Sequence, residues 1–355
     1  MAHRLVYSTD LGKAYQGDSR SLLDSEDVSP DSVDLIFTSP PFALTRQKDY
    51  GNKAADEYLS WFETFVPVFS RVLADTGSLV VDVGGAYLPG EPRRSTYHFE
   101  LAVMLGRHFE LCQDFYWFNP AKLPSPVQWV NVQPLRLKDS VNLVLWFAKD
   151  ASNTKADNSR VLRRYSKSMQ SLLRSGYQVR RRPSNWNISA KFMNDRGGSI
   201  PSNLLGFTDE DAEEPAELVG QPFESAFDNI LAIANTASRG PYIDECRKHG
   251  LKPHPARFPT GLPAFFIEFL TEPGDLVCDP FSGSNASGAA AEASRRRWIS
   301  CDVDAEGPFA GTYVRTSAFW FPNAKLEPGF EDIPEPNWSA PARKVAPKTQ
   351  QERLL

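Results

Sequence analysis

The 355-residue sequence is poor in cysteine, with four residues scattered at Cys112, Cys246, Cys278 and Cys301. They form no CxxC pair, which argues against a metal knuckle or a disulfide framework, and we expect no metal site. The sequence also has no run of 18 apolar residues, and no apolar segment near its N-terminus resembles a secretion signal. A membrane-spanning or secreted protein is therefore disfavoured, and we expect a cytoplasmic one.

No strong excess of one charge is present, since 39 basic and 44 acidic residues give a net charge of −5. This balance argues against a simple basic coat protein for nucleic acid. The charges are nevertheless uneven, because residues 151–200 hold eleven basic and two acidic residues, a local charge of +9 that leaves −14 for the rest. This window indicates a segment that faces a polyanion, and the alternative is a solvated helix face.

Hydrophobic residues make up 41% of the chain, and short apolar runs alternate with segments of helical spacing. We predict strands at 33–37, 77–83, 115–118 and 141–147, and helices at 55–73 and 99–111. A second set follows as helix 263–270, strand 275–278, helix 288–295 and strand 298–301, of which the last three make a βαβ unit. The alternation predicts an α/β sheet covered by helices. Between these sets, the acidic stretch 209–217 is expected to be an exposed loop.

A loop rich in small residues, Asp279–Gly288, follows one predicted strand and leads into a helix. Small side chains let the backbone approach a ligand closely, and the N–H groups of a helix start favour anionic or carboxylate ligands. The next strand ends at Asp302, where a carboxylate could bind ribose hydroxyls. The loop lacks the G-x-G-x-x-G spacing, which disfavours NAD. The alternative is an ordinary strand–helix turn.

A second motif, Thr38-Ser39-Pro40-Pro41-Phe42, stands at the end of the first predicted strand of the sheet. Open α/β sheets bind ligands at this edge. The two prolines lack N–H groups and stiffen the chain, so nearby carbonyls can accept hydrogen bonds from a substrate, while Phe42 offers a flat face. Such a corner suits a planar group with an exposed NH2. The alternative is a rigid turn with a core phenylalanine.

These two motifs together resemble those of the beta-class amino-directed DNA methyltransferases, whose signature is (Asp/Asn/Ser)-Pro-Pro-(Tyr/Phe). The order here, target-amino motif, basic region and then cofactor loop, matches the beta-class permutation. The resemblance is strongest to cytosine-N4 enzymes and spans about residues 5–315. It is carried by TSPPFAL, YGN (50–52), VVDVGGAY (80–87), DFYWFNPAKLPSP (114–126), GGSIPSNLL (197–205), HPARFP (254–259) and GSNASG (283–288).

The resemblance implies a Rossmann-like fold that uses S-adenosylmethionine (AdoMet), with a mixed seven-stranded sheet in circularly permuted order and an inserted target-recognition region. Residues 1–150 would form the catalytic half with the TSPPF motif. Residues 151–250 would recognise DNA, and residues 251–325 would form the AdoMet-binding half. Residues 326–355, which the resemblance does not cover, hold five prolines and are expected to form a proline-rich tail.

The resemblance also assigns roles to residues. Ser39, Pro40, Pro41 and Phe42 would be catalytic. Asp302 would bind the ribose, Asp18 the adenine amino group, and Phe258 and Pro259 the methionine end. The remaining cofactor contacts would be Asp279, Pro280, Phe281, Gly283, Ser284 and Asn285, although Asn285 stands where many relatives have glycine. The alternatives are a helix cap for Asp18 and a surface charge for Asp302.

Within this family, DNA would bind through the basic window, where arginines can hold phosphates or guanine edges. The candidates are Arg163, Arg164, Arg180, Arg181, Arg182, Lys191 and Arg196. Tryptophans 117, 129 and 186 are interpreted as core or interface residues. The target base would leave the duplex and stack on Phe42. Each cysteine follows a non-proline residue, which disfavours the cysteine nucleophile of carbon-5 cytosine methylation.

The predicted function is a site-specific DNA methyltransferase, with cytosine N4 favoured by Ser39 over adenine N6. An RNA or protein amide methyltransferase and a catalytically silent DNA-binding regulator are the alternatives. The resemblance implies double-stranded DNA as partner and a location at the bacterial nucleoid, and it adds a homodimer and a cognate restriction endonuclease as candidate partners.

Overall fold

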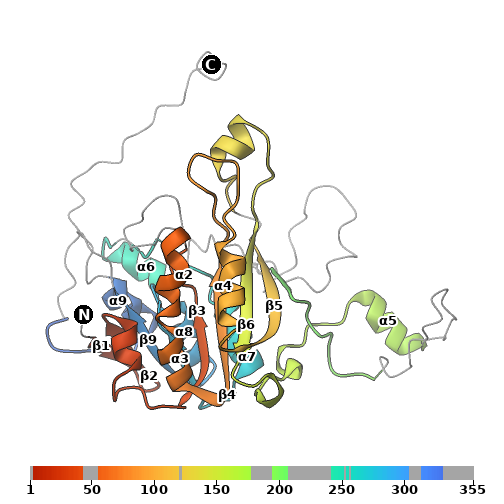
Figure 1. Ribbon diagram of the computed structural model, residues 1–355. Helices are drawn as coiled ribbons and strands as arrows, with labels where there is room; N and C mark the ends of the chain where they lie inside the picture. Colours follow the sequence, from red (N-terminus) through yellow and green to blue (C-terminus); the bar gives the residue numbers. More distant parts are fainter. Residues whose placement is uncertain are drawn as a thin grey trace.

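The computed structural model describes residues 3–42, 55–119, 122–176, 194–206, 241–251, 253–255, 257–303 and 313–330. Within these residues, ten strands form one mixed sheet in the order β10-β1-β2-β9-β8-β3-β4-β6-β5-β7 (Figure 1). The strands are β1 (Arg4–Ser8), β2 (Gly12–Gln16), β3 (Val33–Thr38), β4 (Leu73–Val83), β5 (Glu110–Phe118), β6 (Val141–Ala148), β7 (Leu204–Gly206), β8 (Leu276–Asp279), β9 (Arg297–Asp302) and β10 (Lys325–Leu326).

The expected count of seven strands is wrong because both sides of the sheet carry additional strands. The seven inner strands run from β2 to β5 in the order above. Strand β1 pairs antiparallel with β2 and β10 on one side, and the short β7 pairs parallel with β5 on the other. These short additions have no apolar pattern long enough to be recognised in the sequence.

Strand direction gives the sheet two distinct edges. Strands β2, β9, β8, β3 and β4 are parallel, and β5 has the same direction because both β4 and β5 pair antiparallel with β6. We call the edge where these six strands end the carboxyl edge, and the opposite one the amino edge. Ligands of open α/β sheets bind at the carboxyl edge.

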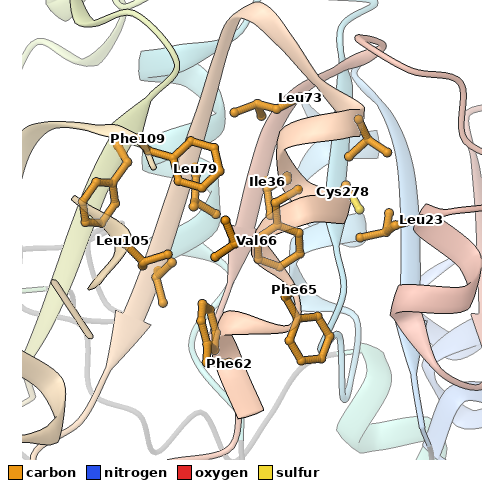
Figure 2. Close-up of a cluster of buried hydrophobic side chains, with 14 of the residues drawn as sticks. Leu23, Ile36, Phe62, Phe65, Val66, Leu73, Leu79, Leu105, Phe109 and Cys278 are labelled. Atoms are coloured by element: carbon orange, nitrogen blue, oxygen red, sulfur yellow. The ribbon is translucent and has the colours of Figure 1, made fainter. Parts of the chain in front are cut away.

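The described residues form nine α-helices. They are α1 (Ser19–Leu23), α2 (Ala55–Glu63), α3 (Val66–Val72), α4 (Tyr97–Leu105), α5 (Lys167–Ser175), α6 (Pro241–Lys248), α7 (Gly261–Leu270), α8 (Ala286–Ala293) and α9 (Tyr313–Ser317). Helices α1 to α4 cover one face, where Ile36 packs among their side chains (Figure 2). Helices α7, α8 and α9 cover the other, against Leu35 and Phe37 of the same strand. Alternation along β3 thus fills two cores.

Two predicted helices differ from the structure. The helix expected at 55–73 is divided into α2 and α3, because Pro67 in the first turn of α3 would clash with the carbonyl of Glu63 in a continuous helix. The helix expected at 99–111 ends at Leu105, Gly106 caps it, and β5 begins at Glu110. The other predicted strands and helices are confirmed within a few residues of their expected bounds.

The middle of the chain and its end are described in part. The acidic stretch 209–217, the YGN segment, Trp186 and residues 331–355 lie outside the described residues. Trp117 belongs to the core, whereas Trp129 is half-buried. Before residue 331 the predicted tail packs on the body, since Phe330 is buried beneath Arg4. In the described ranges, no helix has the length and apolar character needed to span a bilayer.

Candidate active site

The two motifs singled out in the sequence meet at the carboxyl edge. Thr38 ends β3 and Asp279 ends β8, and these strands are neighbours in the sheet. The Thr38 hydroxyl donates to Asp279 Oδ1 over 3.0 Å, with both side chains buried. The corner at 38–42 and the loop at 279–284 are therefore on the same side of the molecule, in direct contact.

Ser39 leads into a polar network on the neighbouring strand β4. Its hydroxyl donates to Asp82 Oδ2 over 3.0 Å, and Asp82 Oδ1 accepts from Asn142 Nδ2 over 3.2 Å. Lys122 Nζ donates in turn to Asn142 Oδ1 over 3.2 Å. Burial raises the pKa of Asp82 to about 6, against the opposing effect of its hydrogen bonds. Because the Ser39 proton points to Asp82, the lone pairs of the Ser39 oxygen can accept hydrogen bonds from a substrate.

The Phe42 ring packs against Gly84, the residue that follows β4, where there is no room for a side chain. A Cβ built on Gly84 would lie 2.6 Å from the Phe42 ring, so a larger residue there would displace the ring. Pro40 is buried, while Pro41 and Phe42 are half-buried. The corner thus combines a fixed aromatic ring with a hydroxyl oriented by a carboxylate.

Asp82, Asn142 and Lys122 are site residues that the sequence reasoning missed. Asp82 did carry a signal, because it is a carboxylate within the apolar run Val80–Val83 of a strand predicted to be buried. Such a residue is rarely buried without a partner or a role. Asn142 carried no comparable signal, because it lies in no motif and is distant from Asp82 in the chain. Lys122 stands in the motif at 114–126, but nothing in that motif indicates that its side chain reaches Asn142.

Asp279 organises the small-residue loop. It accepts from the Ser287 hydroxyl and, over 3.1 Å, from the backbone N–H of Phe281, and burial raises its pKa to about 6. Asn285 is fully buried in the left-handed conformation and caps α8 by accepting from Gly288 N–H. The Asn285 amide also donates to the Tyr7 hydroxyl over 2.9 Å. The Asn285 side chain is thus engaged within the protein.

The ends of β2, β8 and β9 surround the remaining predicted cofactor residues. Asp302 Oδ2 accepts from Gly283 N–H over 2.7 Å, and its carbonyl accepts from Gly17 N–H over 3.0 Å. Gly283 has a φ of +49°, and a Cβ there would lie 3.0 Å from the His254 ring. Asp18 caps α1 and pairs with Arg20, whose hydrogen bond lowers the pKa of that carboxyl.

These residues fit AdoMet as a ligand. Carboxylates at Asp302 and Asp18 suit a ligand with ribose hydroxyls, an amino group and a positive charge. The helix-cap interpretation of Asp18 is confirmed, while Asp302 is tied to the loop and is not a surface charge.

Aromatic residues enclose both ends of this region. Phe258 packs edge-on against Phe37 of β3 at a centroid distance of 5.6 Å, and Pro259 beside it is buried. Phe281 packs against Phe65 at 4.9 Å. Ser284 is buried, and its carbonyl accepts from Trp320 Nε1 over 2.8 Å, while Pro280 is also buried. Two residues of the HPARFP segment, which precedes α7, therefore lie beside this region: Phe258 contacts β3, and His254 lies against Gly283 of the small-residue loop.

The basic window is only partly described. Arg164 and Arg196 are exposed, and Arg163 pairs through its backbone with Ser199. Arg180, Arg181, Arg182 and Lys191 lie outside the described residues. Lys155 and Arg160, in contrast, are bound to the body, by two carboxylates and by backbone carbonyls of α7's end respectively. Part of the local charge thus fastens the segment to the sheet.

The cysteines are poorly suited to nucleophilic chemistry. Burial is the main cause that raises the pKa of the Cys112 and Cys246 thiols to about 11, and it also raises those of Cys278 and Cys301. The thiolate is the reactive form, and burial disfavours it at all four residues.

Comparisons with known proteins identify the family. The chain is 44% identical over 321 residues to the type II methyltransferase M.PvuII of Proteus hauseri, covering 89% of this chain and 85% of that protein. The solved structure of PvuII DNA methyltransferase (cytosine-N4-specific) matches with a TM-score of 0.64 and 40% identity, over 88% of this chain and 87% of that one. M.ScaI of Streptomyces caespitosus is 23% identical over 84% of this chain and 79% of its own.

The match to M.PvuII confirms the predicted resemblance to a cytosine-N4 enzyme, and the structural match confirms a methyltransferase fold. A family model described as DNA methylase matches residues 33–307. The chain therefore belongs to the N6/N4 DNA methylase family.

Proposed function

We propose that the protein transfers a methyl group from AdoMet to the exocyclic N4 of a cytosine flipped out of double-stranded DNA. The observation that carries this proposal is the direct contact between the two corners, the Thr38 hydroxyl on Asp279, beside the Ser39–Asp82 hydrogen bond. The similarity to cytosine-N4-specific relatives supports the choice of base.

Ser39 and Pro40 are proposed to prepare the amino group for attack. An aromatic NH2 is a weak nucleophile because its lone pair is delocalised into the ring. The Ser39 oxygen and the Pro40 carbonyl accept hydrogen bonds from its two N–H groups and draw the nitrogen towards tetrahedral geometry. Asp82 accepts a hydrogen bond from the Ser39 hydroxyl, which makes the Ser39 oxygen a stronger acceptor. Pro41 stiffens the corner, and Phe42 stacks on the base.

The methyl donor lies over the loop 279–284 in this proposal. AdoMet supplies an electrophilic methyl group on a positively charged sulfur. Asp302 holds the ribose, Asp18 the adenine amino group, and Phe258 and Pro259 flank the methionine end. Pro280, Phe281, Gly283, Ser284 and Asn285 shape the loop, and Asp279 fixes it to the target corner. The rate then comes from orientation and electrostatics.

The domain organisation follows the beta-class permutation in this proposal. Residues 1–150 and 251–325 form the two halves of the catalytic domain, joined in one sheet. Residues 151–250 recognise DNA. The residues proposed to contact it are Arg163, Arg164, Arg180, Arg181, Arg182, Lys191 and Arg196. The protein would work at the bacterial nucleoid in the cytoplasm, either alone or as a homodimer, with a cognate endonuclease as the reason for methylation.

Nucleoside mass spectrometry tests the target base. DNA from cells that express the protein should contain N4-methylcytosine, and DNA from cells that express Ser39→Ala should not. The variant should bind AdoMet with the affinity of the wild type, which shows that the loop is intact. N6-methyladenine alone would identify the adenine enzyme instead, and transfer to RNA or peptide without DNA would refute the proposal.

A further inference from the structure

An arm of the chain, residues 122–140, projects between β5 and β6 at the carboxyl edge. Strand β5 ends and β6 begins at this edge, and the arm rises above it (Figure 1). At its base, Lys122 bonds Asn142, which bonds the Asp82 that orients Ser39. The arm is therefore attached directly to the proposed methyl-transfer site.

Polar contacts hold the arm in one shape. The N–H groups of Leu135 and Arg136 both donate to the Trp129 carbonyl over 3.0 Å. Asp139 pairs with Arg94 at 2.8 Å. The Arg136 guanidinium lies 5.4 Å from the centre of the Tyr87 ring. The turn at residues 134–138 is thus held by hydrogen bonds within the arm and by contacts with Tyr87 and Arg94, which follow β4.

The braced arm nevertheless leaves large apolar side chains in solvent. Leu137 is 90% exposed, Leu123 79%, Leu135 66% and Val132 64%. Exposed apolar groups gathered on a rigid projection indicate a binding surface. The leucines at 135 and 137 alternate with Arg136 and Lys138, and the arm carries three basic residues and one acidic, a net charge of +2. Apolar side chains framed by cations match a nucleic acid, with its stacked bases between rows of phosphates.

We propose that Leu135 and Leu137 form a wedge that enters the DNA duplex where the target base leaves it. Proteins that unstack a duplex commonly insert apolar side chains between base steps. Extrusion of a base costs free energy and leaves an unpaired partner and a broken stack. Leucines on an arm whose base is bonded to the site would occupy that space, and the exposed Lys138 would contact a phosphate beside it. This inference rests on the proposed function and adds the element that drives base extrusion.

The test compares a paired and a weakened target in the full-length protein. The recognition site is first found by modification-sensitive sequencing of DNA methylated by the wild type. Two duplexes carrying that site are then used, one fully paired and one with a mismatch opposite the target base. The double variant Leu135→Ser/Leu137→Ser should lose about ten- to hundredfold in kcat/KM on the paired duplex. On the mismatched duplex, which needs little help to open, its loss should be less than about threefold.

Leu111→Ser provides the matched control. Leu111 is 50% exposed near the start of β5, at the opposite edge of the sheet, so this variant should behave as the wild type on both duplexes. Equal losses of the double variant on the two duplexes would mean that the leucines support the fold or DNA affinity alone, and would overturn the wedge. Loss of a dimer in sedimentation would overturn it too, by assigning the surface to a second copy.

The outcome also separates this inference from the function beneath it. A wild type that leaves no methylated base in DNA, so that no recognition site is found, would refute the proposed function. A wild type that methylates both, with a double variant equally active on both, would refute only the wedge.

Discussion

Strands β3 and β8 carry a pair of polar side chains at each end, and the two pairs are built differently. At the amino edge, Lys155 Nζ lies 2.8 Å from both Asp34 and Asp275. At the carboxyl edge, Asp279 is satisfied by the Thr38 and Ser287 hydroxyls and a backbone N–H. The first pair is an ion cluster, whereas the donors to Asp279 among the described residues are all neutral.

The difference follows from what each edge must do. A lysine between two carboxylates cancels their charge and ties strands to the segment that follows β6, which serves stability. A carboxylate bonded only by neutral groups keeps its negative charge in a buried site, and burial raises the pKa of Asp279 and Asp82 to about 6. That uncancelled charge is available for a cationic methyl donor. The charge pattern therefore distinguishes the stabilising ion cluster at the amino edge from the proposed reaction site at the carboxyl edge of the same two strands.

The largest effect is expected from Asp82→Asn at the carboxyl edge. A neutral amide cannot polarise the Ser39 hydroxyl as a carboxylate does, so kcat should fall about 100- to 1,000-fold. Steady-state methyl transfer to duplex DNA measures it. Asp34→Asn at the amino edge is the matched control and should keep the wild-type kcat. A kcat of Asp82→Asn within twofold of the wild type would contradict a role of the Asp82 carboxylate in methyl transfer.

A smaller effect is expected from Asp302→Ala, on cofactor affinity. The change removes a charged acceptor from Gly283 N–H and from the ribose position, so the Kd for AdoMet should rise about 10- to 100-fold. Isothermal titration calorimetry measures it, with Asp75→Ala as control because Asp75 is exposed at the amino edge. An unchanged Kd would show that Asp302 only holds the loop.

Acidification should separate activity from stability. Asp82 and Asp279 are each half protonated near pH 6, so kcat should fall at least about tenfold by pH 5. The folded state binds protons on these two groups before the unfolded state does. Between pH 6 and about 4 their contribution to stability therefore grows as the pH falls, and it is lost as the pH rises through 6.

The measurement pairs a pH profile of kcat with urea unfolding at pH 7 and pH 5. Loss of activity without loss of this stability contribution is expected, and Asp34→Asn should show the same profile as the wild type. A fall in activity that follows unfolding at every pH would contradict the assignment.

The smallest effect on turnover is expected at the amino edge itself. Lys155→Met leaves Asp34 and Asp275 without their shared cation, both little exposed, and should lower the free energy of unfolding by about 1–2 kcal/mol. Urea unfolding measures this, and kcat at a permissive temperature should not change. Lys149→Met, which breaks a pair with the exposed Asp31, should cost less than about 0.5 kcal/mol. Equal costs would show that burial does not distinguish the two pairs.

The sequence predicted the elements whose residues are close together in the chain. The strand at 33–38, the loop after Asp279 and the helix after it have local signals, namely apolar runs, prolines and small residues. The neighbourhood of the two corners also followed, because both motifs end strands whose carboxyl ends share an edge.

The remaining site residues depended on contacts that no local pattern encodes. Asn142 reaches Asp82 only because β6 pairs antiparallel with β4, and Lys122 reaches Asn142 only because the arm returns beside β6. The ion cluster of Lys155 with Asp34 and Asp275 was missed for a similar reason, because the charge of Lys155 was counted with the basic window expected to face DNA. Charge alone does not reveal whether a lysine meets a phosphate or a carboxylate.

In the proposed reaction, the hydrogen bond from Thr38 to Asp279 fixes how far the methyl group travels. Adjacent strands of a sheet are about 4.8 Å apart, and this bond locks the end of one strand to the end of its neighbour. In the proposed reaction the donor and acceptor sites therefore stand at the ends of two neighbouring strands, and the strand spacing sets the length of the methyl transfer.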